Sequence, residues 1–270
     1  MGRAATGGGG LRGPRPEAPS RGPARIASGS PPIAFPDPRH APGDRPLAVG
    51  GDLHPQRLVH AYRRGIFPWY CEGGPILWWS PDPRAVIVPA ELRISRRLRR
   101  RLRRDEFEVT WNAAFESVVR GCAAPRTGAG SETWITPEMQ RAYLSLHAAG
   151  HAHSIECWRD GVLVGGLYGV SVGRVFCGES MFSRVPDASK VALASLCAEG
   201  YVLIDCQVPN EHLMRLGARL VPRYEFLAFL DHFAGSPEVA SGTVDGHVHP
   251  VSLPSFTATG RMSGDAGREE

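Results

Sequence analysis

Residues 154–177 read SIECWRDGVLVGGLYGVSVGRVFC, and this stretch decides the fold class. Three runs rich in β-branched and aromatic residues follow one another, over 154–158, 162–170 and 173–177. The first break between them holds Asp160-Gly161, a dipeptide that strongly favours a tight hairpin turn. We therefore expect three consecutive antiparallel strands.

The sequence on either side predicts helices and further strands. Strands are expected over 85–88, 107–110 and 202–206, and helices over 95–104, 112–122, 137–149, 188–199 and 211–216. Asn112 is the expected cap of its helix, and residues 219–226 are expected to return toward the sheet. This order indicates an α+β fold with helices packed on a mixed sheet. It is also the element order of GNAT-type acyltransferases, although a fold alone does not determine function.

Composition divides the chain into four parts. Residues 1–30 and 235–270 are dominated by small and turn-forming residues and bury too little apolar surface to offset their ordering entropy, so we expect disordered tails. Residues 31–83 are rich in Pro, Gly and aromatic residues and indicate a small α-rich N-terminal domain. Its helix is expected to be capped by Asp52 and to end at Gly65. Residues 84–234 then form the GNAT-like main domain.

The overall composition excludes several classes of protein. The chain has 270 residues, 42% of them hydrophobic, and its net charge of +4 is only a weak sign of a nucleic-acid partner. No apolar run reaches the roughly 18 residues of a membrane span, and the N-terminus lacks a secretory apolar region. Six cysteines without a C-x-x-C pair indicate buried thiols in a reducing compartment. We expect a cytoplasmic protein.

Residues 93–104 carry a dense basic run on a predicted helix. Ile94, Leu98 and Leu102 recur every four residues and share one face, which would dock the helix on the domain. The other positions are nearly all arginine: Arg93, Arg96, Arg97, Arg99, Arg100, Arg101, Arg103 and Arg104. Like charges at this density favour a polyanionic partner, of which a phosphate backbone is the natural one. The alternatives are a solvated basic face or a membrane-surface helix, but the apolar stripe is narrow and lacks aromatic residues.

Two segments carry polar residues beside apolar strands. Asp205 and Gln207 stand two apart in LIDCQ (203–207), so both side chains are expected on one side of the strand, with Cys206 facing the core. Such a pair is suited to positioning an amine, although Asp205 is equally suited to capping the next helix. Glu179, beside Met181, is suited to holding an ammonium group at an apolar pocket, or is simply a structural loop residue.

Aromatic and histidine residues allow two interpretations each. Tyr62, Trp69 and Trp134 belong to an aromatic set on which the bases of an RNA end would stack, although most of that set is expected to form a core. His151 and His153 lack a third ligand at metal-binding spacing, so we expect hydrogen bonds at a strand start and no metal.

Eight stretches of the chain carry a family resemblance. In order they are LAVGGDL (47–53), YRRGIFPW (62–69), ILWWSPDPR (76–84), TWIT (133–136), GHAHSIE (150–156), GGLYG (165–169), FCGESMFS (176–183) and LIDCQ (203–207). They closely resemble bacterial leucyl/phenylalanyl-tRNA–protein transferases over about residues 33–230. The resemblance implies transfer of Leu, and less readily Phe or Met, from aminoacyl-tRNA to proteins that begin with Arg or Lys, which marks them for N-degron degradation.

The resemblance also implies the site residues. The residues implicated in catalysis are Asp205 and Gln207; the aminoacyl pocket maps to Leu167, Phe176, Glu179 and Met181; the site of the terminal adenosine maps to Tyr62, Trp69 and Trp134. The basic run maps to the tRNA-binding patch. Leu167 departs from the family pattern, which has Met, and the connection before Leu203 is shorter than usual. No metal or cofactor is implied, and we expect a monomer.

Two other functions remain open at this point. An acetyl-CoA-dependent acyltransferase would cradle the CoA pyrophosphate in a Gly-rich loop, but residues 183–190 contain no glycine. A non-catalytic RNA-binding protein would explain the arginines but not the polar residues at the two strand ends.

Overall fold

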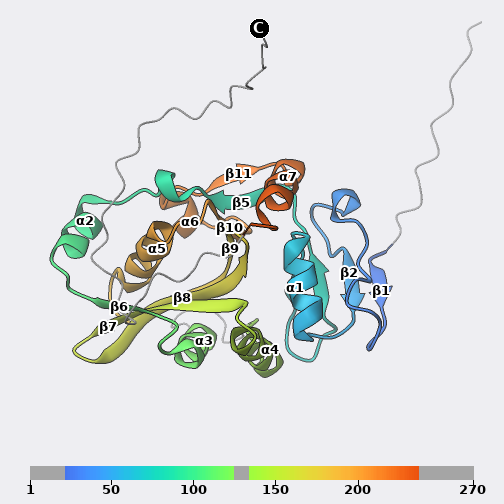
Figure 1. The fold of residues 1–270 in the computed structure, drawn as a ribbon, viewed down its shortest axis with the longest axis horizontal. Coiled ribbons are helices and arrows are strands. Elements are labelled where there is room, and N and C mark those ends of the chain that lie inside the picture. The colour runs from blue at the N-terminus through green and yellow to red at the C-terminus, as the bar shows by residue number, and fades with distance from the viewer. Residues whose placement is uncertain (1–21, 125–133, 237–270) are drawn as a thin grey trace, which may run out of the picture.

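The computed structural model describes residues 22–124 and 134–236 (Figure 1). Disorder was predicted for 1–30 and 235–270, and most of both ranges, 1–21 and 237–270, falls outside the described residues. Within the first range, residues 24–26 form a strand, which the prediction of disorder did not anticipate. Within the described part of the chain, no helix is long and apolar enough to cross a membrane.

The small N-terminal domain is built on a four-stranded sheet in the order β1-β2-β4-β3. Its elements are β1 (Ala24–Ile26), β2 (Ala48–Gly50), β3 (Phe67–Pro68), β4 (Leu77–Trp79), the helix α1 (Pro55–Arg63) and the 3-10 turn η1 (Pro38–His40). The domain therefore begins before the boundary predicted at residue 31, because β1 pairs in parallel with β2. The structure also corrects its α-rich description, since α1 packs beside a sheet.

Capping of α1 differs from the prediction. His54 is the cap, and its Nδ1 accepts a hydrogen bond from the Gln56 backbone N–H at 3.3 Å. Asp52 lies one turn outside the helix, where it accepts from the backbone of His54 and pairs with the buried Arg57 guanidinium at 3.1 Å. Pro at the first helical position makes the later start favourable.

The main domain contains a mixed seven-stranded sheet in the order β11-β5-β10-β9-β8-β7-β6. The strands are β5 (Arg84–Ile87), β6 (Glu108–Trp111), β7 (Ala152–Arg159), β8 (Val162–Val172), β9 (Val175–Ser183), β10 (Leu203–Gln207) and β11 (Arg219–Val221). Asp160 and Gly161 both have positive φ, as the predicted tight turn between β7 and β8 requires. Strands β8 and β9 are longer than predicted. The α+β class and the preceding N-terminal domain are confirmed.

Helices cover both faces of this sheet. In Figure 1, α5 (Ala188–Ala198) lies above β8, whereas α3 (Phe115–Ala123) and α4 (Pro137–Ala148) lie below it. The remaining helices are α2 (Arg96–Arg103), α6 (Glu211–Arg215), α7 (Arg223–Phe233) and the short η2 (Pro89–Glu91). One apolar core lies on the α5 side, and a second joins α3, α4 and α7 to the small domain.

Two predicted details of the main domain are wrong. Asn112 does not cap α3, which begins at Phe115; it has φ +58° and instead accepts a hydrogen bond from the Ser154 backbone at 2.9 Å. The return to the sheet ends at Val221, and the following residues form α7 rather than continuing a strand. Pro222 precedes this helix and lacks the N–H that would continue a β-ladder.

Strands β9 and β10 diverge at the middle of the sheet. They pair in parallel from Leu203↔Val175 to Asp205↔Cys177, and the pairing stops there. On its other side, β9 shifts register against β8, because Tyr168 faces Ser180 while Gly169 faces Gly178. The extra residue is Glu179, and such a bulge redirects a side chain. The fork between β9 and β10 is where the candidate site lies.

Candidate active site

A pocket of about 990 Å³ opens at the fork between β9 and β10. Its walls come from both faces of the sheet and from the small domain. The side chains that line it at the fork and on the α5 and α6 side include Glu179, Met181, Leu193, Leu196, Ile204, Cys206, Gln207, His212 and Leu213; those on the α3 side include Trp69, Cys122, Trp134, Tyr168 and Phe182.

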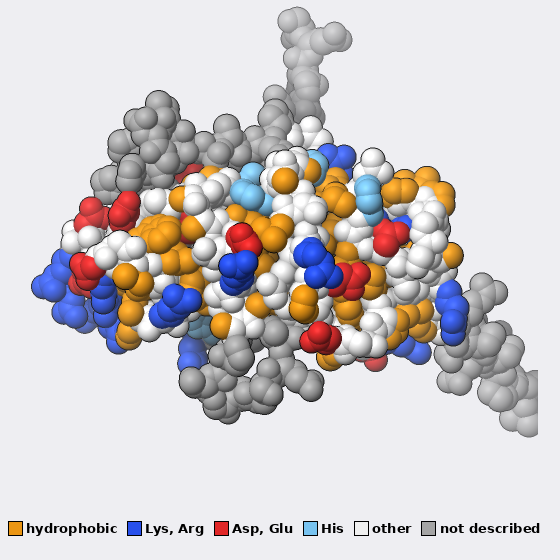
Figure 2. All heavy atoms as spheres, turned by 90° about the horizontal axis from the view of Figure 1, so that it is seen from below, with side chains coloured by type: hydrophobic (Ala, Val, Ile, Leu, Met, Phe, Trp, Pro, Cys, Tyr) orange, Lys and Arg blue, Asp and Glu red, His pale blue; other side chains and the backbone are white. Residues whose placement is uncertain are grey.

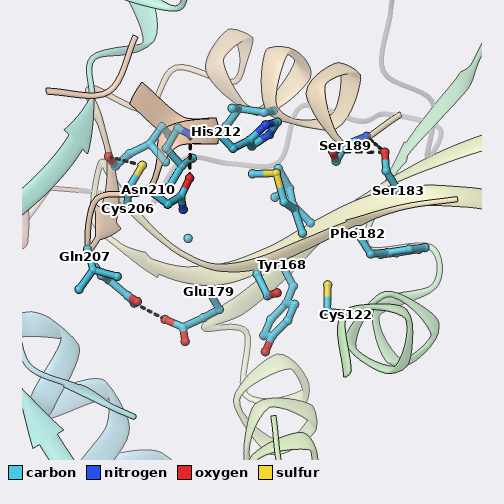
Figure 3. Close-up of a pocket in the computed structure, with 18 of the residues that line it drawn as sticks. Cys122, Tyr168, Glu179, Phe182, Ser183, Ser189, Cys206, Gln207, Asn210 and His212 are labelled. Atoms are coloured by element: carbon cyan, nitrogen blue, oxygen red, sulfur yellow. Dashed lines mark hydrogen bonds between the residues drawn. The ribbon is translucent and has the colours of Figure 1, made fainter. Parts of the chain in front are cut away.

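Glu179 and Gln207 bridge the two diverging strands. The side-chain amide of Gln207 donates a hydrogen bond of 2.7 Å to Glu179 Oε1, and Figure 3 shows the two side chains pointing toward each other. Tyr143 on α4 donates to the other carboxyl oxygen at 2.5 Å, and its own hydroxyl lies 2.6 Å from that of Tyr62. A buried chain of polar groups therefore runs from the small domain to the pocket.

Burial raises the pKa of Glu179 to about 7. The desolvation of the carboxylate is the largest cause, and it outweighs the hydrogen bonds from Tyr143 and Gln207, which favour the charged form. A carboxyl group with this pKa exchanges its proton near neutral pH, and it does so in direct contact with an amide that lines the pocket.

Asp205 lies away from the pocket, in a buried ion pair. Arg84 on β5 donates to both carboxylate oxygens, from Nε at 2.8 Å and from Nη2 at 2.7 Å, and both side chains are fully buried. Asp205 Oδ1 also accepts from the Gln207 backbone N–H at 2.9 Å. Asp205 does not line the pocket and does not cap α6, whose cap is Asn210.

A bulge changes the expected alternation along β10. Register shifts between Asp205 and Gln207, and Gln207 takes the left-handed conformation with φ +63°. A non-glycine residue held there is strained, which is a frequent property of functional sites. The prediction that Asp205 and Gln207 share one side is therefore wrong in detail, since only Gln207 reaches the pocket. Cys206 packs against the core on the α5 side, as predicted, and also lines the pocket; burial raises its pKa, which disfavours a nucleophilic thiolate.

All four predicted aminoacyl-pocket residues, Leu167, Phe176, Glu179 and Met181, line the pocket. Leu193 and Leu196 on α5, which were not predicted as site residues, also line the pocket. The α5 sequence is apolar on nearly every side, and this pattern indicates a helix that is buried on more than one face.

The three predicted adenosine-site aromatics do not lie together. Trp69 and Trp134 both line the pocket, and Trp69 remains 40% exposed. Tyr62 is fully buried against Tyr143 and does not reach the pocket wall. His153 meets the prediction made for it, because its Nδ1 lies 3.0 Å from the Asn112 amide near the start of β7.

The arginine-rich helix α2 docks through Leu98 and Leu102, as predicted, whereas Ile94 lies just before the helix and packs against the same core. Leu98 is buried, Ile94 and Leu102 pack beside it, and Ser95 caps the helix. Lys and Arg side chains gather at the left end of Figure 2, the end at which α2 lies in Figure 1. The exposed members of the predicted set are Arg93, Arg96, Arg97, Arg99, Arg100, Arg103 and Arg104.

Asp187 fastens α2 to the start of α5. Arg97 and Arg101 approach its Oδ2 at 2.7 and 3.1 Å, and Lys190 approaches Oδ1 at 2.9 Å. Burial alone would raise the pKa of Asp187, but the hydrogen bonds from Lys190 and Arg97 outweigh it and lower the pKa. A carboxylate thus occupies the strand-to-helix connection where a pyrophosphate-binding loop would present backbone amides, which is unfavourable for CoA.

The fold and the pocket define an α+β protein with a partly apolar pocket beside an amide–carboxyl pair. The family described as leucyl/phenylalanyl-tRNA protein transferase matches residues 86–231, and its N-terminal domain matches residues 51–82. The chain belongs to this family of transferases.

Related proteins with that name support the assignment. One from Azotobacter vinelandii is 55% identical over 198 residues, which cover 72% of this chain and 87% of the relative. One from Aromatoleum aromaticum is 59% identical, with 68% and 79% covered, and one from Pseudomonas aeruginosa is 56% identical, with 71% and 86% covered. A GCN5-related N-acetyltransferase from Kribbella flavida aligns with a TM-score of 0.30 and 16% identity, over 60% of this chain and 58% of that one; at this score the likeness carries no structural conclusion.

Proposed function

We propose that this chain transfers Leu, and less readily Phe or Met, from aminoacyl-tRNA to the N-terminal amine of proteins that begin with Arg or Lys. The observation that carries this proposal is the Gln207–Glu179 pair at the fork, at the end of an apolar pocket. The names of the relatives support leucyl- and phenylalanyl-tRNA as donors.

The pocket suits an aminoacyl-adenosine end. Its apolar part, formed around Leu167, Phe176 and Met181, fits an aliphatic or aromatic side chain. The indole rings of Trp69 and Trp134 are available for stacking on a terminal base. The exposed arginines of α2 supply cations for the phosphate backbone. In this proposal Tyr62 does not contact the base; its hydroxyl is hydrogen-bonded to that of Tyr143, which in turn contacts Glu179.

The reaction is the aminolysis of an ester. The acceptor nitrogen attacks the ester carbonyl carbon, a C–N bond forms, and the bond from that carbon to the ribose oxygen breaks. One proton leaves the nitrogen and one is taken up by the ribose oxygen. The acceptor amine has a pKa near 8, so much of the catalysis is positioning and charge stabilisation. In this proposal the side chain of Gln207 orients the attacking amine.

Asp205 acts through Gln207. Both of its oxygens are occupied by Arg84, and it does not line the pocket, so the geometry disfavours direct proton transfer to it. Its hydrogen bond from the Gln207 backbone holds that residue in its left-handed conformation. We therefore assign Asp205 a positioning role in place of the predicted contact with the amine.

The setting of the reaction belongs to the same proposal. The product would enter N-degron degradation, which places the enzyme in the cytoplasm, and we expect it to act as a monomer without a metal or cofactor. Acetyl-CoA should not raise the melting temperature, and Leu-tRNA should bind more tightly than uncharged tRNA.

The test uses tRNA charged with radiolabelled leucine and an acceptor protein with N-terminal Arg. After the tRNA is deacylated, label should remain in acid-precipitable protein, and it should disappear when the acceptor's N-terminus is acetylated. An absence of transfer, with charged and uncharged tRNA bound equally, would leave a non-catalytic RNA-binding protein.

A further inference from the structure

A second carboxylate lines the pocket beside the reacting groups. Among the described residues that form the pocket wall, the acidic side chains are Glu179 and Glu211. Glu179 is buried, and both of its oxygens are hydrogen-bonded by Gln207 and Tyr143. Glu211 is the first residue of α6, four residues after Gln207, and its side chain is 86% exposed.

The Glu211 carboxylate is not required to cap or stabilise α6. The cap of α6 is Asn210, whose side chain accepts from the Leu213 backbone at 2.9 Å, so the helix does not require the Glu211 carboxylate. Its partner is Arg215 on the next turn, at 2.6 Å, and that guanidinium is also largely exposed. Exposed pairs at this spacing contribute little to stability, so an incoming cation can replace Arg215 with little loss.

The neighbouring groups leave Glu211 as the accessible negative charge at this wall. His212 also lines the pocket, and burial, with Lys190 and Arg215 nearby, lowers its pKa, so it is neutral at pH 7. Arg184, a cationic residue of the wall, donates to the Leu163 carbonyl at 3.2 Å and lies over the Phe182 ring, so its guanidinium is already held in place. In Figure 3, His212 and Asn210, on either side of Glu211 in the sequence, lie above the fork that Gln207 borders.

We propose that Glu211 binds the cationic side chain of the acceptor's N-terminal residue. This inference rests on the proposed transfer reaction and adds the residue that selects its acceptor. Gln207 orients the α-amine of that residue, and a long, flexible side chain with a terminal charge then extends from the end of β10 toward α6. A carboxylate at the open rim of the pocket favours Arg or Lys over neutral residues. It can pair with either side chain, because it recognises positive charge and does not require the bidentate geometry of Arg.

The experiment compares acceptor peptides that differ only in their first residue: Arg, Lys and citrulline. Citrulline keeps the shape of Arg and lacks its charge. With the wild-type protein, KM for the Arg and Lys peptides should lie below that for citrulline. Glu211→Gln should raise KM for the Arg and Lys peptides about fivefold, the upper range for an exposed ion pair, and leave citrulline and Leu-tRNA unaffected.

Two variants serve as matched controls. Glu116→Gln breaks an i,i+4 pair with Arg120 of the same 2.6 Å length on α3, away from the pocket wall, and should change no KM. Arg215→Gln removes the competing cation and should not raise KM for the Arg peptide. An unchanged ratio of KM values for Arg and citrulline in Glu211→Gln, with active transfer, would overturn this assignment alone. A wild-type protein that transfers to no acceptor would overturn the proposed function and the assignment together.

Discussion

Arg84 and Asp205 form a buried, bidentate ion pair that joins β5 to β10 directly beneath the fork. The rings of Phe67 and Phe226 lie 4.9 and 4.6 Å from the Arg84 guanidinium carbon, so this cation is enclosed by aromatic faces and one carboxylate. Because Asp205 also fixes the backbone of Gln207, the pair couples the stability of the sheet to the geometry of the site.

Removal of one member of this pair should be costly for the fold. Asp205→Ala leaves the Arg84 charge buried without its carboxylate, so we expect the free energy of unfolding to fall by about 3–5 kcal/mol in urea denaturation. Asp205→Asn keeps a hydrogen-bond acceptor and should lose less stability while still slowing transfer. An Asp205→Ala protein with wild-type stability and full turnover would contradict the positioning role.

Glu179 should give the protein a distinct pH dependence. Its folded pKa is raised from 4.5 to about 7, so its contribution to stability is fully present below pH 4.5 and is lost as the pH rises through 7. The shift corresponds to about 3 kcal/mol for this fully buried group. We expect urea midpoints of the wild type to fall between pH 5 and pH 8 more steeply than those of Glu179→Gln. Parallel pH profiles for the two proteins would count against this pKa.

The arginines of α2 should divide into two groups. Arg99 and Arg100 are exposed and form no ion pair with another described residue, so Arg99→Ala and Arg100→Ala should weaken tRNA binding, each reducing the salt slope by about 1. Arg101 is held by Asp187 and Glu106, so Arg101→Ala should lower thermal stability and change the salt slope less. The measurement is the tRNA dissociation constant as a function of salt. Equal slopes for all three variants would contradict this division.

Gly169 permits the bulge that directs Glu179 toward the pocket. A Cβ atom there would lie 2.2 Å from the Cys177 carbonyl oxygen and 2.5 Å from the Phe176 ring. Gly169→Ala should therefore displace β9 and reduce both stability and transfer, by more than an alanine at Gly161, where a Cβ meets open space. Gly161→Ala introduces the strain of a positive φ without crowding, whereas Gly169→Ala introduces crowding. The comparison therefore separates the effect of crowding from that of backbone preference. Thermal unfolding and transfer rates provide the readout.

Local signals in the sequence predicted much of the fold. The Asp160-Gly161 turn, the basic helix predicted over 95–104 and the helix beginning at Pro137 depend on neighbours within a few residues, and the structure has all of them. Asn112 failed as a cap because its side chain bonds to β7, a strand distant in the sequence. Strand β1 was missed because three residues in a Gly- and Pro-rich segment become a strand only through pairing with β2.

The candidate site was predictable in some of its members but not in its geometry. Family motifs indicated Glu179 and Gln207, yet the bulges that bring them together depend on strand registers that no local pattern encodes. Arg84 was overlooked, although a charged residue at the head of an apolar strand is a sign of a buried partner. Tyr143 carried no comparable sign, because its role arises from contact with Glu179 across 36 positions of sequence.

The most direct test of the account is single-turnover transfer by Gln207→Ala with Leu-tRNA bound beforehand. The loss of the amide that bridges the fork should slow transfer about 100-fold, while the dissociation constant for Leu-tRNA stays within about twofold of wild type. Gln207→Asn tolerates the left-handed backbone but falls short of Glu179, so it should be slow as well. Transfer at the wild-type rate by both variants would contradict a reaction centred on this fork.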